Sequence, residues 1–102
     1  MNMQHIMAQA QKMQKELDKK MKEFELKEFE YNYQNGAVIV RITGNLEIKD
    51  LKINPALIDP EDTITLQEMI VEAINAAIKI VSQKKDSIQD SMMPKSKMGG
   101  FF

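Results

Sequence analysis

The longest uninterrupted pattern in the chain is an apolar stripe over residues 2–26, a stretch that contains neither glycine nor proline. Its apolar residues recur in steps of three or four, about 3.5 on average, which is the period of a helix that packs along one seam. A strand, whose side chains alternate between two faces, cannot collect this pattern on one side. These residues therefore predict one long amphipathic helix, with a stripe formed by Met3, Ile6, Ala10, Met13, Leu17, Met21 and Phe24.

Residues 27–53 change to the alternation of apolar and polar residues that is typical of strands. Asn35-Gly36 in their middle is the strongest short signal for a hairpin, because a type I′ turn requires positive φ at both of its central residues. Gly44-Asn45 marks a second turn. We therefore predict three strands, over 27–34, 37–43 and 46–53.

The third of these strands has a defect in its pattern. Leu46 and Ile48 share one face of a regular strand, whereas Leu51 and Ile53 fall on the other. A β-bulge near residues 49–50 would restore a single apolar face. The alternative is a strand that is buried from both sides.

A second helix is predicted over 64–90, with a period near 3.6. Thr65 and Glu68 have the spacing of a capping box, and Asp62 or Thr63 are rival caps. Acidic residues crowd its start and lysines its end, an arrangement that the helix dipole favours and that needs no functional explanation. Its stripe comprises Leu66, Met69, Ile70, Ala73, Ile74, Ala77, Ile78 and Val81.

These elements define an α/β fold of the α+β type, in which a long N-terminal helix, a three-stranded antiparallel sheet and a long C-terminal helix form one domain over 1–91. Residues 92–102, rich in Met, Pro, Gly and Phe, are predicted to be a flexible tail. A helix over 2–26 would be about 37 Å long and a seven-residue strand about 23 Å. The helix must therefore overhang the sheet, and a second subunit is the natural cover for its stripe and for the open sheet edges. We expect a homodimer with projecting helical arms.

The composition excludes several classes of protein. There is no cysteine, which rules out disulfides and thiol chemistry, and no apolar run approaches the roughly 18 residues of a membrane span. The N-terminus does not have the pattern of a secretory signal, so we expect a soluble cytoplasmic protein without a membrane partner.

No residue pattern indicates catalysis. The single histidine, His5, stands alone, and no glycine-rich phosphate-binding motif is present. The acidic residues Asp59, Glu61 and Asp62 are explained by proline turns and helix capping. We therefore predict no enzymatic activity, no small-molecule substrate, no cofactor and no metal site.

The lysines are the remaining candidates for function. The formal net charge is −1, but both ends of the chain are basic and two inner segments are acidic. On the first helix Lys12, Lys15, Lys19 and Lys22 recur with the helical period, which is compatible either with a solvated flank or with a row that follows a phosphate backbone. With one arginine in the chain, bidentate reading of bases is disfavoured. The candidate DNA-binding residues are Lys12, Lys15, Lys19, Lys20, Lys22, Lys79, Lys84 and Lys85.

The order of these features resembles the YbaB/EbfC family of bacterial nucleoid-associated proteins. Residues 7–14 (MAQAQKMQ) are similar to the family's opening, and residues 36–45 (GAVIVRITGN) to its hairpin. Residues 51–58 (LKINPALI) and 66–77 (LQEMIVEAINAA) resemble the segments that follow, although Asn54 stands where the family usually has Asp. The Met/Pro/Gly/Phe-rich end is also similar, so the resemblance spans essentially the whole chain.

The resemblance implies a tweezer-like homodimer that binds double-stranded DNA with low sequence specificity and alters its conformation. It also implies a place in the nucleoid, with roles in nucleoid organisation and gene regulation. The alternative reading of the residues is a protein-interaction adaptor, whose methionine-rich arms grip a partner protein. Salt-dependent DNA binding would distinguish the first reading from the second.

Overall fold

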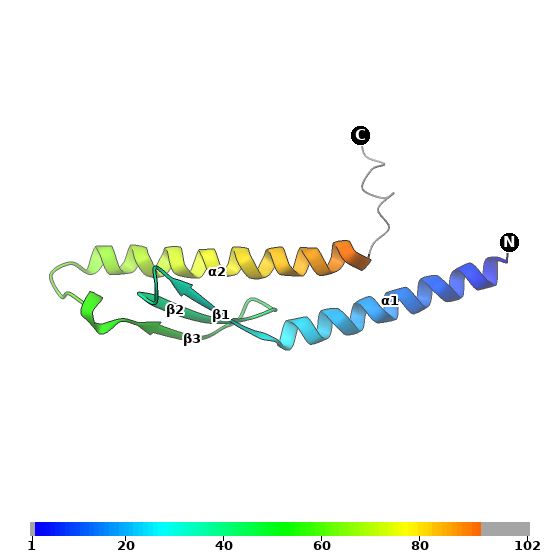
Figure 1. Ribbon diagram of the computed structural model, residues 1–102, viewed down its shortest axis with the longest axis horizontal. Helices are drawn as coiled ribbons and strands as arrows, with labels where there is room; N and C mark the ends of the chain where they lie inside the picture. The colour runs from blue at the N-terminus through cyan, green and yellow to red at the C-terminus, as the bar shows by residue number, and fades with distance from the viewer. Residues whose placement is uncertain (1, 93–102) are drawn as a thin grey trace, which may run out of the picture.

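The computed structural model describes residues 2–92, which form two long helices and a three-stranded antiparallel sheet (Figure 1). The predicted α+β class is confirmed. The expected tail over 92–102 lies, from residue 93 onward, outside the described residues. The elements in chain order are α1 (Met3–Leu26), β1 (Glu28–Tyr33), β2 (Val38–Thr43), β3 (Ile48–Ile53), the 3-10 helix η1 (Pro55–Leu57) and α2 (Thr63–Met92).

The β1–β2 connection has the predicted type of turn. Asn35 and Gly36 have φ values of 56° and 90°, both positive as a type I′ turn requires. The Ala37 amide donates a hydrogen bond of 3.3 Å to the Gln34 carbonyl oxygen and closes the turn. Gln34 itself has φ 47°, outside the range of a strand, so β1 ends at Tyr33.

A β-bulge in β3 restores one apolar face, as its pattern predicted. Arg41 pairs with Asp50 and the next residue, Ile42, pairs with Ile48, which leaves Lys49 as the extra residue. Partners across an antiparallel ladder lie on the same face, so all three apolar residues of β3 share the face of the buried residues of β2. The alternative of a strand buried from both sides is wrong, because no residue of β3 is buried and three of its six residues are exposed.

The strand begins two residues later than the pattern suggested. Leu46 has φ 65°, in the left-handed region, and its amide donates to the Thr43 carbonyl oxygen at 2.9 Å. A residue in this conformation belongs to a turn rather than to a pleated strand. The β2–β3 connection therefore includes Leu46, and β3 starts at Ile48.

The core lies between the sheet and α2, which covers one face of it (Figure 1). Val38, Val40 and Ile42 of β2 are fully buried against α2. Ala73 and Ala77 lie on the side of α2 that faces the sheet, and both are fully buried. Because their side chains are small, the helix can pack close to the central strand β2. The buried residues are Phe24, Val38, Val40, Ile42, Ala73, Ala77 and Val81.

Helix α1 leaves the sheet at one end and projects beyond the end of α2 (Figure 1). The described chain is accordingly elongated, with extents of 72 × 32 × 17 Å. Phe24, in the last turn, is the one buried residue of α1. The expected overhang is present, but its geometry is different, because α1 does not lie across the sheet at all. Its N-terminal half is an arm.

Candidate nucleic-acid interface

Four of the candidate lysines form a row on one exposed side of α1, from its middle toward its C-terminal end. Lys12, Lys15, Lys19 and Lys22 are all exposed, and their spacing places them on one side of α1. Phe24 is two residues beyond Lys22, so at about 100° per residue it points to nearly the opposite side of the helix, toward α2. The row therefore faces solvent from the middle of α1 to the turn before its end, whereas residues 3–11 carry no lysine.

The charges of this row are not neutralised by ion pairs within the described residues. Lys15, Lys19 and Lys22 line a shallow hollow together with two acidic residues, Asp18 and Glu23. The Asp18 carboxylate accepts a hydrogen bond of 2.9 Å from the Gln14 side-chain amide. Lys49 on the sheet is different: its ammonium lies 2.7 Å from the Glu47 carboxylate. This contact lowers the pKa of Glu47 and raises the pKa of Lys49, so that pair carries no net charge.

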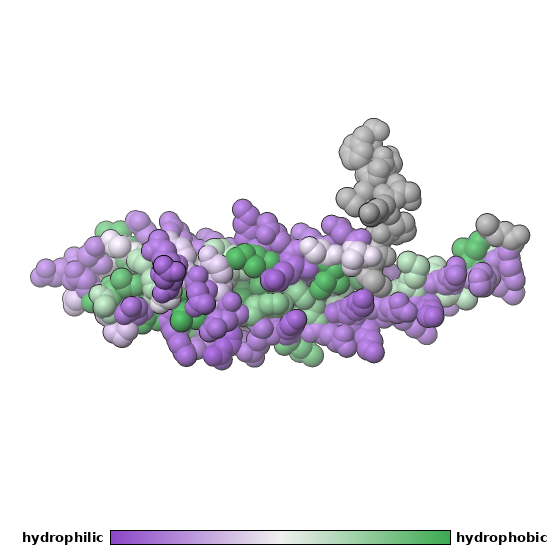
Figure 2. Space-filling view, viewed as in Figure 1, coloured by the Kyte–Doolittle hydropathy of each residue, from purple (hydrophilic) through white to green (hydrophobic). Residues whose placement is uncertain are grey.

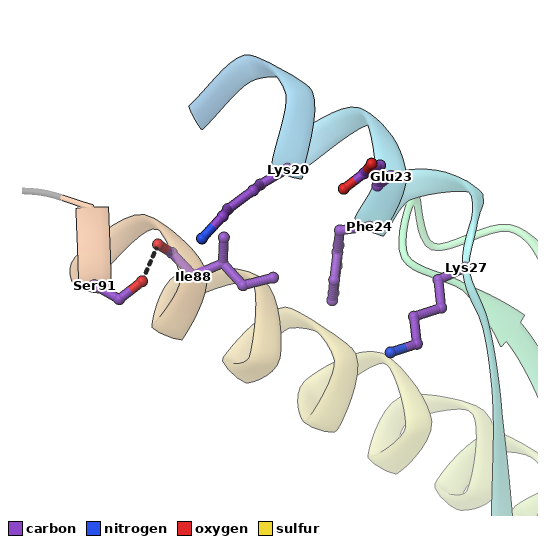
Figure 3. Close-up of a pocket in the computed structure, with 6 residues that line it drawn as sticks. All are labelled: Lys20, Glu23, Phe24, Lys27, Ile88 and Ser91. Atoms are coloured by element: carbon purple, nitrogen blue, oxygen red, sulfur yellow. Dashed lines mark hydrogen bonds between the residues drawn. The ribbon is translucent and has the colours of Figure 1, made fainter. Parts of the chain in front are cut away.

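Lys20 does not belong to the row but lies on the side of α1 that faces α2. Figure 3 shows its ammonium pointing across a hollow toward α2, with Lys27 pointing into the same hollow from the other side of Phe24. Ile88 and Ser91 of α2 form the opposite wall. The hollow thus lies at the root of the arm, where the two helices meet.

Aromatic rings bring one further lysine, Lys84, to this root. The Phe29 ring of β1 lies 5.3 Å from the Phe24 ring, between centroids. The ammonium groups of Lys27 and Lys84 lie 5.6 Å and 5.8 Å from the Phe29 ring centroid, within reach of a cation–π contact. Lys20, Lys27 and Lys84 therefore form a root cluster.

Sequence reasoning missed Lys27. It stands in an acidic segment between a helix and a strand and belongs to no periodic pattern. Its one local signal is the aromatic residue two positions later, Phe29.

The structure does not bring the three candidate lysines of α2 together as one row. Lys79 and Lys84 are five residues apart, which places them well over a quarter of a turn from each other around the helix. Lys79 is exposed, whereas Lys85 is half-buried. Only Lys84 lies next to residues of the arm's root.

The acidic residues before α2 act as caps and turn residues. The Asp62 carboxylate accepts hydrogen bonds from the Thr65 amide at 3.2 Å and from the Thr65 hydroxyl at 2.7 Å. Asp59 accepts from the Glu61 amide at 2.9 Å. Asp62 is thus the residue that caps the start of α2, and not Thr63. Within residues 2–92 no group of three metal-ligating side chains occurs.

Neither long helix is apolar over a sufficient length to span a membrane, as far as the described residues are concerned. His5 is exposed near the start of the arm. Within the described part of the chain, the site that remains is the lysine row on α1 together with the root cluster.

An exposed row of lysines beside a second lysine cluster is compatible with a nucleic-acid-binding class of proteins, and the family comparison points to the same class. The model of the YbaB/EbfC DNA-binding family matches residues 1–96. The chain therefore belongs to the YbaB/EbfC family of bacterial nucleoid-associated, DNA-binding proteins. The resemblance inferred from the sequence is confirmed.

Named relatives support this assignment over nearly the full length. The chain is 48% identical to a nucleoid-associated protein of Malacoplasma penetrans, over 92% of this chain and 99% of that one. It is 40% identical to a nucleoid-associated protein of Ureaplasma urealyticum over 100% of both chains. The crystal structure of an uncharacterized protein from Helicobacter pylori has the same fold, with a TM-score of 0.72 at 22% identity, covering 92% of this chain and 99% of that one.

Proposed function

We propose that this protein binds double-stranded DNA as a homodimer with low sequence specificity, alters DNA conformation and acts in the nucleoid of the bacterial cytoplasm. Roles in nucleoid organisation and gene regulation follow from such binding. The proposal excludes enzymatic activity and a small-molecule substrate. The observation that carries it is the exposed row of Lys12, Lys15, Lys19 and Lys22, which forms no ion pair within the described residues.

The row suits a phosphate backbone better than base edges. Ammonium groups on flexible stems act as point charges, and phosphate contacts position a protein without reading sequence. The root cluster of Lys20, Lys27 and Lys84 extends the positive surface to the base of the arm. A dimer would present two such arms to one duplex, which accounts for both affinity and a change in DNA shape.

The test is a titration of a random-sequence duplex of about 30 base pairs, followed by fluorescence anisotropy across salt concentrations. We expect binding that weakens steeply with salt. Lys12→Glu with Lys19→Glu should weaken it by roughly tenfold or more and reduce the salt slope, because each lost phosphate contact removes about one unit of slope.

The matched control is Lys49→Glu with Lys52→Glu, which changes the net charge equally at exposed positions of β3. This control should retain most of the affinity. Equal losses in the two double variants, with the oligomeric state unchanged in light scattering, would contradict a specific role for the arm.

A protein-interaction adaptor remains the second candidate, and the exposed apolar stripe of the arm favours it. In that case the duplex would not bind even at low salt, while the dimer stays intact. The family would then indicate the fold and not the activity.

A further inference from the structure

The N-terminal half of α1 presents an apolar stripe that nothing in the described structure covers. Met3 is 71% exposed, Ile6 43% and Met13 47%, although these residues share the side of α1 that buries Phe24 further along. Apolar side chains gathered on one side of a helix mark a surface that binds another element. Figure 2 shows this as green and pale-green side chains along the upper edge of the arm, with polar side chains along its lower edge.

The stripe begins where α2 ends. Ser91, one residue before the end of α2, lines the root hollow together with Lys20 of α1 (Figure 3). Beyond this point α1 continues alone, in the direction in which α2 was running (Figure 1). The chain that leaves α2 therefore starts at the near end of the uncovered stripe.

We propose that residues 93–102 of the same chain bind along this stripe and cover it. They include four large apolar residues, Met93, Met98, Phe101 and Phe102, a high share for a ten-residue segment. Pro94 and the Gly99-Gly100 pair disfavour a continuation of α2, so the segment can follow the arm in an extended form. This inference does not depend on DNA binding.

Residues 93–102 are long enough to cover the stripe on α1. From Lys20 to Met3 the arm measures about 26 Å, at 1.5 Å per residue. Ten extended residues span at most about 33 Å, so the segment reaches the start of the arm with some slack. A shorter segment would leave Met3 and Ile6 exposed.

The charges are also complementary. Glu16 and Glu23 flank Lys20 along the arm, at spacings of four and three residues, next to the point where the segment would start. The early part of the segment carries Lys95 and Lys97, which can pair with these carboxylates. The lysine row on the other side of α1 would stay free.

The test uses the absence of cysteine from the chain. Gly100→Cys creates a single attachment site for a nitroxide spin label on the otherwise intact protein. The label broadens the amide NMR signals of nearby residues, so residues 3–13 of α1 should lose intensity. Residues 47–53 of the sheet serve as the internal reference and should keep theirs.

Two further variants separate binding to the stripe from chance proximity. Phe101→Ser with Phe102→Ser removes two aromatic rings from the segment, and it should restore the arm signals. Met13→Gln on the stripe should do the same. Lys15→Gln on the opposite side of the helix is the matched control, and it should leave the broadening in place.

A second copy of the chain is the competing occupant. Isotope-labelled chain without a nitroxide, mixed with spin-labelled chain at natural abundance, reports contacts between copies alone. We expect no broadening of the arm in this mixture. Broadening there, or none on the arm in the single-chain sample, would overturn the proposal.

Discussion

At Gly44 the last turn of α1 comes so close to the β2–β3 connection that only hydrogen fits between them. A Cβ there would overlap the Phe24 carbonyl oxygen and lie 2.7 Å from its carbonyl carbon, while the Gly44 amide donates to the Lys27 carbonyl oxygen at 2.9 Å. This approach joins the arm to the sheet. The Gly44-Asn45 pair predicts a turn, but nothing local in the sequence predicts the close contact.

Gly44→Ala should lower the free energy of unfolding by about 3 kcal/mol, because backbone atoms must move to admit the methyl group. Gly36→Ala is the matched control. A Cβ at Gly36 meets nothing within 4 Å, and its cost of about 1 kcal/mol comes from positive φ alone. Urea denaturation measures both. If Gly44→Ala and Gly36→Ala lower the free energy of unfolding equally, the close contact between Gly44 and Phe24 is contradicted.

Tyr33 makes a second contact between segments that are far apart in the chain. Its hydroxyl donates to the Glu72 carboxylate and ties β1 to α2. This hydrogen bond, with the negative charge of Glu72 adding to it, raises the pKa of Tyr33. A raised pKa means that the folded state holds the proton more tightly than the unfolded state does.

The stabilisation is therefore fully present below the unfolded pKa of about 10, and it is lost as pH rises through the raised folded value. Tyr33→Phe should lower the melting temperature at pH 8 and reduce its alkaline decline. Tyr31→Phe is the control and should retain most of that decline, because Tyr31 is the smallest of the causes that raise the pKa of Tyr33. Melting curves by circular dichroism from pH 7 to pH 11 test this, and identical declines in all three proteins would argue against the bond.

At the scale of elements, β3 shows how a single extra residue corrects a pattern. Deleting Lys49 would leave Ile48 opposite Ile42 and Asp50 opposite Arg41 without a bulge, so every apolar residue would keep its face. Deleting Lys52 instead would shift Ile53 relative to Val38 and turn it away from the core. The two deletions remove the same residue type from one strand.

We expect the Lys49 deletion to cost about 1 kcal/mol, including the loss of its exposed ion pair, and the Lys52 deletion about 3 kcal/mol or more. Urea denaturation gives the difference, and amide spectra show whether the ladder persists. A larger cost for the Lys49 deletion would mean that the bulge itself, and not the shared face, stabilises the sheet.

At the scale of the whole molecule, a long arm on a small sheet leaves apolar surface uncovered in a single chain. Ile64 and Val71, near the start of α2, are 65% and 57% exposed and line one shallow hollow. The outer edges of β1 and β3 are also unpaired within the described sheet. These features support the proposed homodimer, with the hollow as part of its interface.

Ile64→Lys with Val71→Lys should raise the dimer dissociation constant by roughly 100-fold, because about 3 kcal/mol of apolar contact is lost. Asn75→Lys with Gln83→Lys adds the same charge at exposed positions of the same helix and should leave the dimer intact. Sedimentation velocity distinguishes them. If neither pair of substitutions changes the dimer dissociation constant, the interface lies elsewhere on the molecule.

The sequence by itself determined the elements and the hairpin turn, and it reduced the third strand to two alternatives, of which the bulge is one. These depend on side-chain period and on the φ that a residue tolerates, which are local properties. It also carried the family resemblance, because five ordinary segments occur in one order. The sequence also predicted the lysine row, because one helix carries all four of its residues, Lys12, Lys15, Lys19 and Lys22, and their spacing is a local property.

Only the tertiary structure decided where the arm points and which residues meet at its root. Lys20, Lys27 and Lys84 come from two helices and the link to a strand, and they converge because Phe24 and Phe29 pack together. The contacts of Gly44 with Phe24 and of Tyr33 with Glu72 likewise join segments that are far apart in the chain. Such contacts result from the packing of whole elements, and no local pattern of residues encodes them.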